Sequence, residues 1–181
     1  MATHVALLRG VNVGGKNKLP MKELAGMFID AGCEGVNTYI QSGNVVFRAE
    51  SGIVEKLPEV IADRIAKRFG YRTSIVLRTT EEMRSVVSRN PFIAAGAGED
   101  LLHVLFLAGE PDSGRVNNLD PQRSPPDLFT VCGRDVYLCL PNGVGRTKLT
   151  NSYFDTKLGT ISTGRNWRTV MKLLDLMQCV V

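Results

Sequence analysis

The feature that most constrains the fold is the order in which strand-like and helix-like segments follow one another. The apolar run from His4 to Arg9 is typical of a buried strand, and a helix is predicted between Pro20 and Gly32, residues that favour a helix start and a helix stop. Two strand-like runs joined at Ser42-Gly43 follow, then a second helix in which Pro58 is awkward, and a strand at Arg72–Arg78. The first half therefore has the order β-α-β-β-α-β.

The same order begins again in the second half of the chain. Thr79 and Glu82 predict a capping box for a short helix, and Asn90-Pro91 with the loose residues behind it marks a break. The elements predicted after the break are strands at Leu101–Leu107, Leu128–Cys132 and Val136–Leu140, helices near 111–118 and 149–158, an extended piece at Ile161–Thr163 and a final helix carrying Trp167. We therefore predict an α+β protein of two ferredoxin-like (split β-α-β) subdomains with antiparallel sheets, at residues 1–90 and 91–181.

Composition limits the class of protein. Hydrophobic residues make up 44% of the chain and charged residues 22%, which excludes intrinsic disorder and a coiled coil. The formal net charge of +4 favours anionic partners without singling out nucleic acid. There is no run of about 18 apolar residues, no signal-peptide pattern and no C-x-x-C spacing. We therefore expect a cytoplasmic protein with no membrane association, no disulfides and no metal site.

The polar loop after the first strand is the sharpest candidate for a ligand site. Gly10, Gly15 and Lys16 have the G-x-x-x-x-G-K spacing of a phosphate-binding P-loop. Asn17 stands where a P-loop requires a Ser or Thr hydroxyl, and the predicted helix starts only at Pro20, so its amides would not point at the phosphates. These two features argue against a true P-loop.

A looser anion-binding turn is the second interpretation of this loop. The backbone amides of Gly14 and Gly15 would bind the anion, with positive charge from Lys16 and Lys18. The third interpretation is a connection whose glycines only turn the chain. All three interpretations concern the same residues, and the sequence leaves the last two open.

The segment Ser162–Thr169 lies where a strand gives way to the last helix. Free backbone donors and the positive end of the helix dipole coincide there with Arg165 and Arg168, so an anionic group can bind. The alternative is that Thr163 or Asn166 only caps the helix, while Trp167 anchors it to the core.

Two further polar positions complete the candidate set. The residues Gln41–Asn44 are mainly interpreted as a hairpin turn. Gln41 and Asn44 also offer side-chain amides to a ligand near the strand ends. Lys148 would supply another positive charge, against the simpler interpretation of a solvated lysine.

Familiar catalytic patterns are missing from the sequence. It contains neither a G-x-S-x-G elbow nor an H-E-x-x-H helix. His4 and His103 fall at or within strands and are expected to be structural, and Cys132 and Cys139 alternate with apolar residues and are expected to be inert. Whether the protein is an enzyme therefore stays open, and no residue identifies a reaction or a cofactor.

Two other classes of function compete with small-molecule binding. RNA-recognition domains share the predicted strand order, but they stack bases on aromatic residues of the central strands, and here only Phe47, Tyr39, Phe106 and Tyr137 are available. A protein-interaction module is the other rival, and it predicts a contiguous exposed apolar patch. The oligomeric state is not determined by the sequence.

Several motifs are spread over nearly the whole chain, namely A-L-L-R-G-V-N-V-G-G-K-N-K-L-P-M, T-Y-I-Q-S-G-N-V-V-F, N-P-F, H-V-L-F-L and R-N-W-R-T-V. They resemble those of the bacterial domain-of-unknown-function family 1697. The resemblance implies an α+β protein of two ferredoxin-like subdomains, in agreement with the element order, and it implies no activity. Thr147, Gly164 and Arg168 depart from the usual Ser, Thr and Asn of the family, and Arg168 adds a charge.

The resemblance, taken residue by residue, gives a set of candidate ligand-binding positions. The polar motif positions of the family fall on Arg9, Asn12, Gly14, Gly15, Lys16, Asn17, Gln41, Ser42, Asn44, Lys148, Arg165, Asn166, Trp167 and Thr169. We expect a ligand bearing phosphate or carboxylate where the loop of residues 10–18 meets the start of the last helix. Arg9, Lys16 and Arg165 would neutralise its charge, and Asn12, Asn17, Gln41 and Asn166 would orient it.

Overall fold

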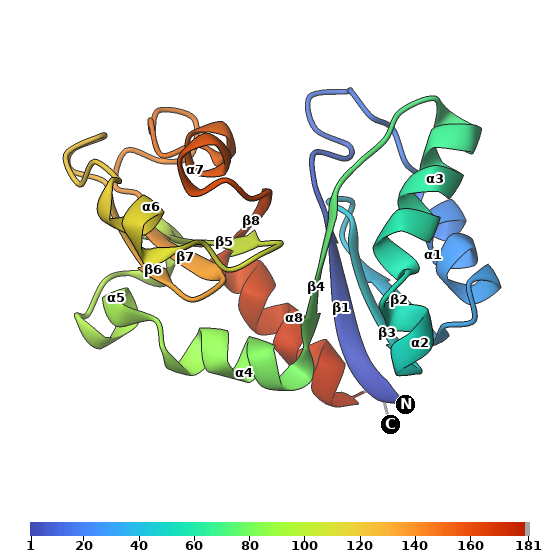
Figure 1. Cartoon of the computed structure of the whole chain (residues 1–181). Coiled ribbons are helices and arrows are strands. Elements are labelled where there is room, and N and C mark those ends of the chain that lie inside the picture. Colours follow the sequence, from blue (N-terminus) through green and yellow to red (C-terminus); the bar gives the residue numbers. More distant parts are fainter. Residues whose placement is uncertain (180–181) are drawn as a thin grey trace. The chain divides into compact units, whose positions relative to one another are not determined.

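A computed structural model describes residues 1–179 of the chain, and within them the strands form two antiparallel sheets of four strands each (Figure 1). The chain divides into two compact units. The first unit comprises residues 1–84 together with the segment from Lys172 onward, and the second unit comprises residues 85–171. The predicted α+β class with antiparallel sheets is confirmed.

The first unit has the strand order β2-β3-β1-β4. Its elements are β1 (Ala2–Leu8), α1 (Met21–Asp30), β2 (Glu34–Tyr39), β3 (Asn44–Ala49), α2 (Ser51–Val54), α3 (Leu57–Phe69) and β4 (Ile75–Thr79). The helices α1 and α3 lie on one face of this sheet (Figure 1), where Phe28 of α1 packs on Phe47 of β3 with 5.2 Å between ring centroids. Pro58 falls in the first turn of α3, where a helix has no internal partner for an N–H group. The second helix predicted from the sequence is therefore two helices, α2 and α3.

The second unit repeats this topology with the strand order β6-β7-β5-β8. Its elements are α5 (Pro91–Ala94), the 3₁₀ turn η1 (Glu99–Leu101), β5 (Leu102–Leu107), α6 (Ser113–Asn117), β6 (Leu128–Cys132), β7 (Asp135–Cys139), α7 (Asn151–Leu158) and β8 (Ser162–Asn166). One face of the sheet packs on α7 through the fully buried Phe154. The order of both units is consistent with the predicted split β-α-β arrangement.

Two helices begin in one unit and end in the other, namely α4 (Thr80–Ser88) and α8 (Trp167–Cys179). The predicted capping box of α4 is confirmed. The backbone N–H of Thr79 donates to the Glu82 carboxylate at 2.8 Å, and the N–H of Glu82 donates to Thr79 Oγ1 at 3.2 Å. This exchange satisfies two of the backbone donors that every helix start leaves open.

Strand pairing shows which residues of the two units are equivalent. His4 of β1 pairs with Thr79 of β4, and His103 of β5 pairs with Asn166 of β8. The central strands accordingly share the pattern H-V-x-x-L-x-G, at residues 4–10 and 103–109. Each unit also carries a buried arginine at the equivalent position of its edge strand, Arg78 and Arg165. The duplication thus extends beyond element order to individual residues.

Candidate functional site

The loop between β1 and α1 is a small hairpin, called here the hairpin loop (residues 10–19). The N–H of Lys16 donates to the carbonyl of Val13 at 3.0 Å across the turn Gly14-Gly15. Gly14 and Gly15 have φ angles of 56° and 74°, the left-handed pair that a type I′ turn requires. The loop is therefore not a P-loop, and α1 starts only at Met21.

Asparagine side chains close the hairpin loop from within. Asn12 Nδ2 donates to the carbonyls of Leu19 at 2.9 Å and Gln41 at 2.7 Å, and Asn12 Oδ1 accepts from the N–H of Leu19 at 2.8 Å. Asn17 Nδ2 donates to the carbonyl of Gly10 at 3.0 Å. Both donor hydrogens of the Asn12 amide are thus used to hold the loop, so this side chain positions the loop.

The turn between β2 and β3 is held against the hairpin loop. Gly43 is buried there, and a Cβ at this position would lie 2.6 Å from Val11 Cγ2 and 2.7 Å from Leu8 Cβ. The fully buried Asn44 donates to the carbonyl of Tyr39 and to Ser42 Oγ. Ser42 and Asn44 are therefore part of the turn's own hydrogen-bond network.

Left-handed backbone concentrates in these two loops. Among the described residues, the non-glycine positions with positive φ are Asn12, Asn17 and Ile40. A β-branched residue such as Ile40 is strained at a φ of 48°, and surrounding structure must hold it there.

The charged groups of the first unit's candidate set differ in exposure. Lys16 and Lys18 are exposed, and neither forms an ion pair with any residue among 1–179. Arg9 is half-buried, and its backbone N–H and carbonyl bond to Ser74 and Thr73. The exposed cations of this loop are therefore the lysines.

Arg165 lies inside the second unit. Its side chain is 8% exposed, and Nη1 donates to Thr163 Oγ1 at 2.9 Å and to the carbonyl of Gly164 at 2.7 Å. Burial lowers the pKa of Arg165 to about 10. The exposed cation of this segment is instead Arg168.

The structure contains the helix cap at Asn166 and the buried Trp167 that the sequence predicts. Asn166 Oδ1 accepts from the N–H of Thr169 at 2.8 Å, and Trp167 is 2% exposed. Lys148 is exposed on a loop, where its backbone N–H donates to Ser124 Oγ at 3.0 Å. Asn166 itself is also exposed and lines a pocket.

This pocket, called here the strand-end pocket, lies within the second unit. It opens where β5 begins and where β7 and β8 end, and its volume is about 360 Å³. Its lining residues are Glu99, Asp100, His103, Leu140, Gly143, Val144, Asn166, Trp167 and Arg168. Burial lowers the pKa of His103, and a hydrogen bond with the backbone of Leu101 raises it by a smaller amount. The imidazole is therefore neutral at pH 7. Except for Asn166, Trp167 and Arg168, the sequence did not identify these residues.

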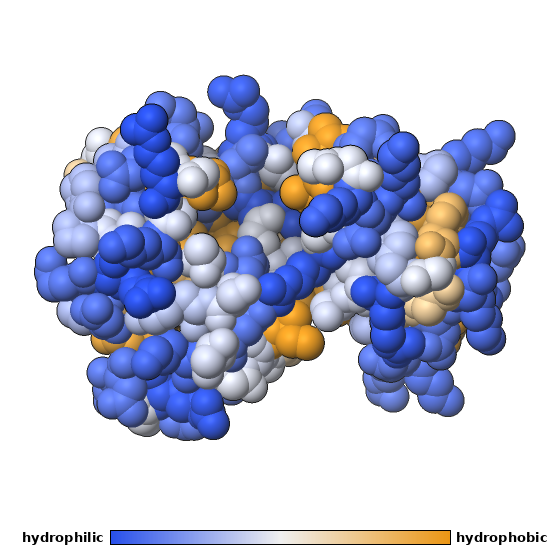
Figure 2. Space-filling view, turned by 90° about the horizontal axis from the view of Figure 1, so that it is seen from above, coloured by the Kyte–Doolittle hydropathy of each residue, from blue (hydrophilic) through white to orange (hydrophobic). Residues whose placement is uncertain are grey.

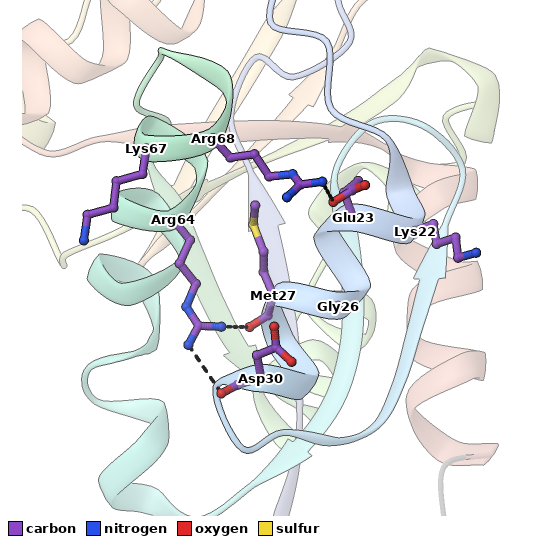
Figure 3. A pocket seen from close by; sticks show the side chains of 8 residues that line it. All are labelled: Lys22, Glu23, Gly26, Met27, Asp30, Arg64, Lys67 and Arg68. Atoms are coloured by element: carbon purple, nitrogen blue, oxygen red, sulfur yellow. Dashed lines mark hydrogen bonds and ion pairs between the residues drawn. The ribbon is translucent and has the colours of Figure 1, made fainter.

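A larger groove of about 570 Å³ lies between α1 and α3 of the first unit (Figure 3). Two of its cations already have partners. Arg68 forms an ion pair with Glu23 at 2.8 Å, and Arg64 donates to the carbonyl of Met27 at 2.7 Å and that of Asp30 at 3.3 Å. These contacts fasten the two helices together and occupy two of the cations that line the groove.

The surface and the helices bear on the other classes of function. On the face seen in Figure 2 the surface is mostly hydrophilic, and hydrophobic residues form small separate patches. No helix within residues 1–179 has both the length and the apolar character needed to cross a bilayer. Within the same residues, no three His, Cys, Asp or Glu side chains are grouped so as to hold a metal ion.

Known proteins identify the family of this chain. A solved structure described as conserved bacterial protein SP0830 from Streptococcus pneumoniae is similar, with a TM-score of 0.72 and 23% identity over 97% of this chain and 98% of that one. At this identity the similarity shows the fold alone. No curated protein matches the chain. The model of the family described as "Protein of unknown function (DUF1697)" matches residues 1–137, so the chain belongs to the DUF1697 family.

Proposed function

We propose that this protein is a cytoplasmic protein that binds a small molecule carrying a phosphate or carboxylate group in the strand-end pocket. The observation that carries the proposal is the pocket itself, a hollow of about 360 Å³ at three strand ends with the Arg168 side chain on its wall. That volume falls within the range of roughly 300–1,000 Å³ that is usual for small-ligand sites. The described cysteines are all free, which supports a reducing compartment.

The lining provides the contacts that an anionic group needs. Arg168 has no ion-pair partner among residues 1–179, so its guanidinium is free to bind phosphate or carboxylate through two parallel hydrogen bonds. The start of α8 adds the positive end of the helix dipole, while the N–H of Thr169 is already bonded to Asn166 Oδ1. The exposed Val144 offers apolar surface for the rest of the ligand.

The hairpin loop supports a separate anion contact on the first unit. Its rigid type I′ turn presents Lys16 and Lys18, which are exposed and unpaired within the described residues. A Lys16→Ala variant tests this contact independently of the strand-end pocket. Solvated lysines alone bind anions weakly. We therefore propose this contact as a second and weaker position for an anionic group.

Of the four aromatic residues that could stack on bases, three are buried and Tyr39 alone is partly exposed. Phe47 and Phe106 are fully buried and Tyr137 is 1% exposed, with its hydroxyl donating to the carbonyl of Val86 at 3.0 Å. Buried rings cannot stack on bases. Small-molecule binding is therefore the better supported function.

A thermal-shift panel of nucleotides, sugar phosphates and small carboxylates tests the proposal. We expect at least one compound to raise the Tm of the wild-type protein, and Arg168→Ala to abolish that rise. Arg84→Ala is the matched control, because Arg84 is also an exposed helical arginine but does not line the pocket. If no compound of the panel stabilises the wild type, the proposed function is wrong.

A further inference from the structure

The strand-end pocket carries charges of both signs. Glu99 and Asp100 come from η1, just before β5, and Arg168 comes from the first turn of α8. None of the three forms an ion pair within 4.0 Å with a residue among 1–179. Opposite charges thus line the same pocket without neutralising one another.

An unpaired mixed lining has a consequence for the ligand. A purely anionic molecule bound in this pocket would be attracted by Arg168 but repelled by the carboxylates of Glu99 and Asp100, which line the same pocket. A molecule with both an ammonium group and an anionic group would find an opposite charge for each. Repulsion of the purely anionic molecule and attraction of the molecule with both charges would then both favour the second ligand.

We propose that the ligand of the strand-end pocket is a small zwitterion, with a primary ammonium group directed to Glu99 and Asp100 and a carboxylate or phosphate directed to Arg168. This inference rests on the proposed function and narrows its ligand class. The pocket volume of about 360 Å³ suits a molecule of amino-acid size. The exposed Val144 of the lining provides apolar surface for a short aliphatic body.

The remaining titratable group of the pocket agrees with this assignment. His103 is neutral at pH 7 because burial lowers its pKa, so it does not add a positive charge that would repel the ammonium group. A neutral imidazole can still donate a hydrogen bond to the ligand or accept one from it.

The test uses two matched pairs of compounds: leucine with 4-methylpentanoate, and O-phosphoethanolamine with ethyl phosphate. Within each pair, the first compound carries an ammonium group that the second compound lacks. The first pair carries a carboxylate and the second pair a phosphate, so the two pairs distinguish these anionic groups. Isothermal titration on the full-length protein is expected to show at least about tenfold tighter binding of one zwitterion than of its partner anion, equal to about 1.4 kcal/mol. The double variant Glu99→Gln/Asp100→Asn should lose this preference, whereas Glu110→Gln, an exposed carboxylate outside the pocket, should keep it.

The outcomes separate this inference from the proposed function. If in both pairs the anion binds the wild type as tightly as its zwitterion, the anion-binding function stands and the zwitterion inference is overturned. If the double variant, shown to be folded by its circular dichroism, keeps the preference, the inference is overturned as well. If the zwitterions and anions of both pairs and the whole thermal-shift panel fail to bind, the proposed function itself falls.

Discussion

The side-chain amide of Asn12 lies 2.7 Å from the carbonyl oxygen of Gln41 and joins two loops that are 29 residues apart in sequence. The same amide also makes two hydrogen bonds to the backbone of Leu19. Asn12 has a φ of 54°, a conformation that asparagine tolerates better than most residues. One side chain therefore fixes the shape of the hairpin loop and its attachment to the β2–β3 turn.

Asn12→Ala should lower the free energy of unfolding by about 1–3 kcal/mol, because it leaves backbone groups without partners and places alanine in left-handed backbone. Urea denaturation measures the change. Asn12→Gly separates the two causes, since glycine accepts the φ angle but makes no side-chain hydrogen bond. Equal stability of Asn12→Gly and wild type would show that the hydrogen bonds contribute nothing.

Gly43→Ala should be markedly more destabilising than Gly14→Ala. Both glycines have positive φ, but an added Cβ at Gly43 would lie 2.6 Å from Val11 Cγ2, while nothing lies within 4 Å of one at Gly14. Left-handed strain alone costs about 1–2 kcal/mol, and the clash at Gly43 adds about 1–3 kcal/mol. Chemical denaturation of the two variants side by side checks the difference, and equal losses would contradict the packing of Gly43 on β1.

Arg64→Ala should cost more stability than Arg68→Ala. Arg64 donates two hydrogen bonds to the backbone of α1, at Met27 and Asp30, whereas Arg68 and Glu23 form a surface pair with side chains 60% and 40% exposed. We expect a loss of about 1–3 kcal/mol for Arg64→Ala and less than about 1 kcal/mol for Arg68→Ala. Denaturation in low and high salt is the measurement, since screening should remove the small effect of Arg68.

Cys33 makes stability depend on alkaline pH. Burial raises its pKa from 9.0 to about 11, so between pH 9 and pH 11 the unfolded chain loses the thiol proton while the folded chain keeps it. Its contribution to stability is therefore complete below pH 9 and is lost as pH rises through about 11. Unfolding curves of wild type and Cys33→Ala from pH 8 to pH 11 should converge as pH rises; parallel curves would contradict the raised pKa.

Thiol labelling checks the same burial independently. At pH 8 a thiol reagent should modify the exposed Cys179 quickly, the partly exposed Cys132 more slowly, and the buried Cys33 and Cys139 only after denaturation. Cys179→Ser should then remove the fast phase of the reaction. Fast labelling that persists in that variant, with Cys33 as the modified residue, would show that Cys33 is accessible.

The sequence alone determined those features that depend on neighbours along the chain. The order of strands and helices, the capping box at Thr79 and Glu82, and the late start of α1 follow from periodicity and from local hydrogen bonding at helix ends. The objection to a P-loop also followed from one local residue, Asn17, and from where the helix begins.

Only the tertiary structure decided which distant residues share a surface or a core. Strand pairing buries Arg165, although the surrounding sequence is typical of an exposed anion-binding segment. Strand pairing also shows that His4 and His103 occupy equivalent positions in the two units. Glu99 and Asp100 looked like part of a loose segment, yet they line the pocket with Arg168, 68 residues beyond Asp100. Register and burial depend on contacts between residues far apart in the chain, and local patterns carry no information about such contacts.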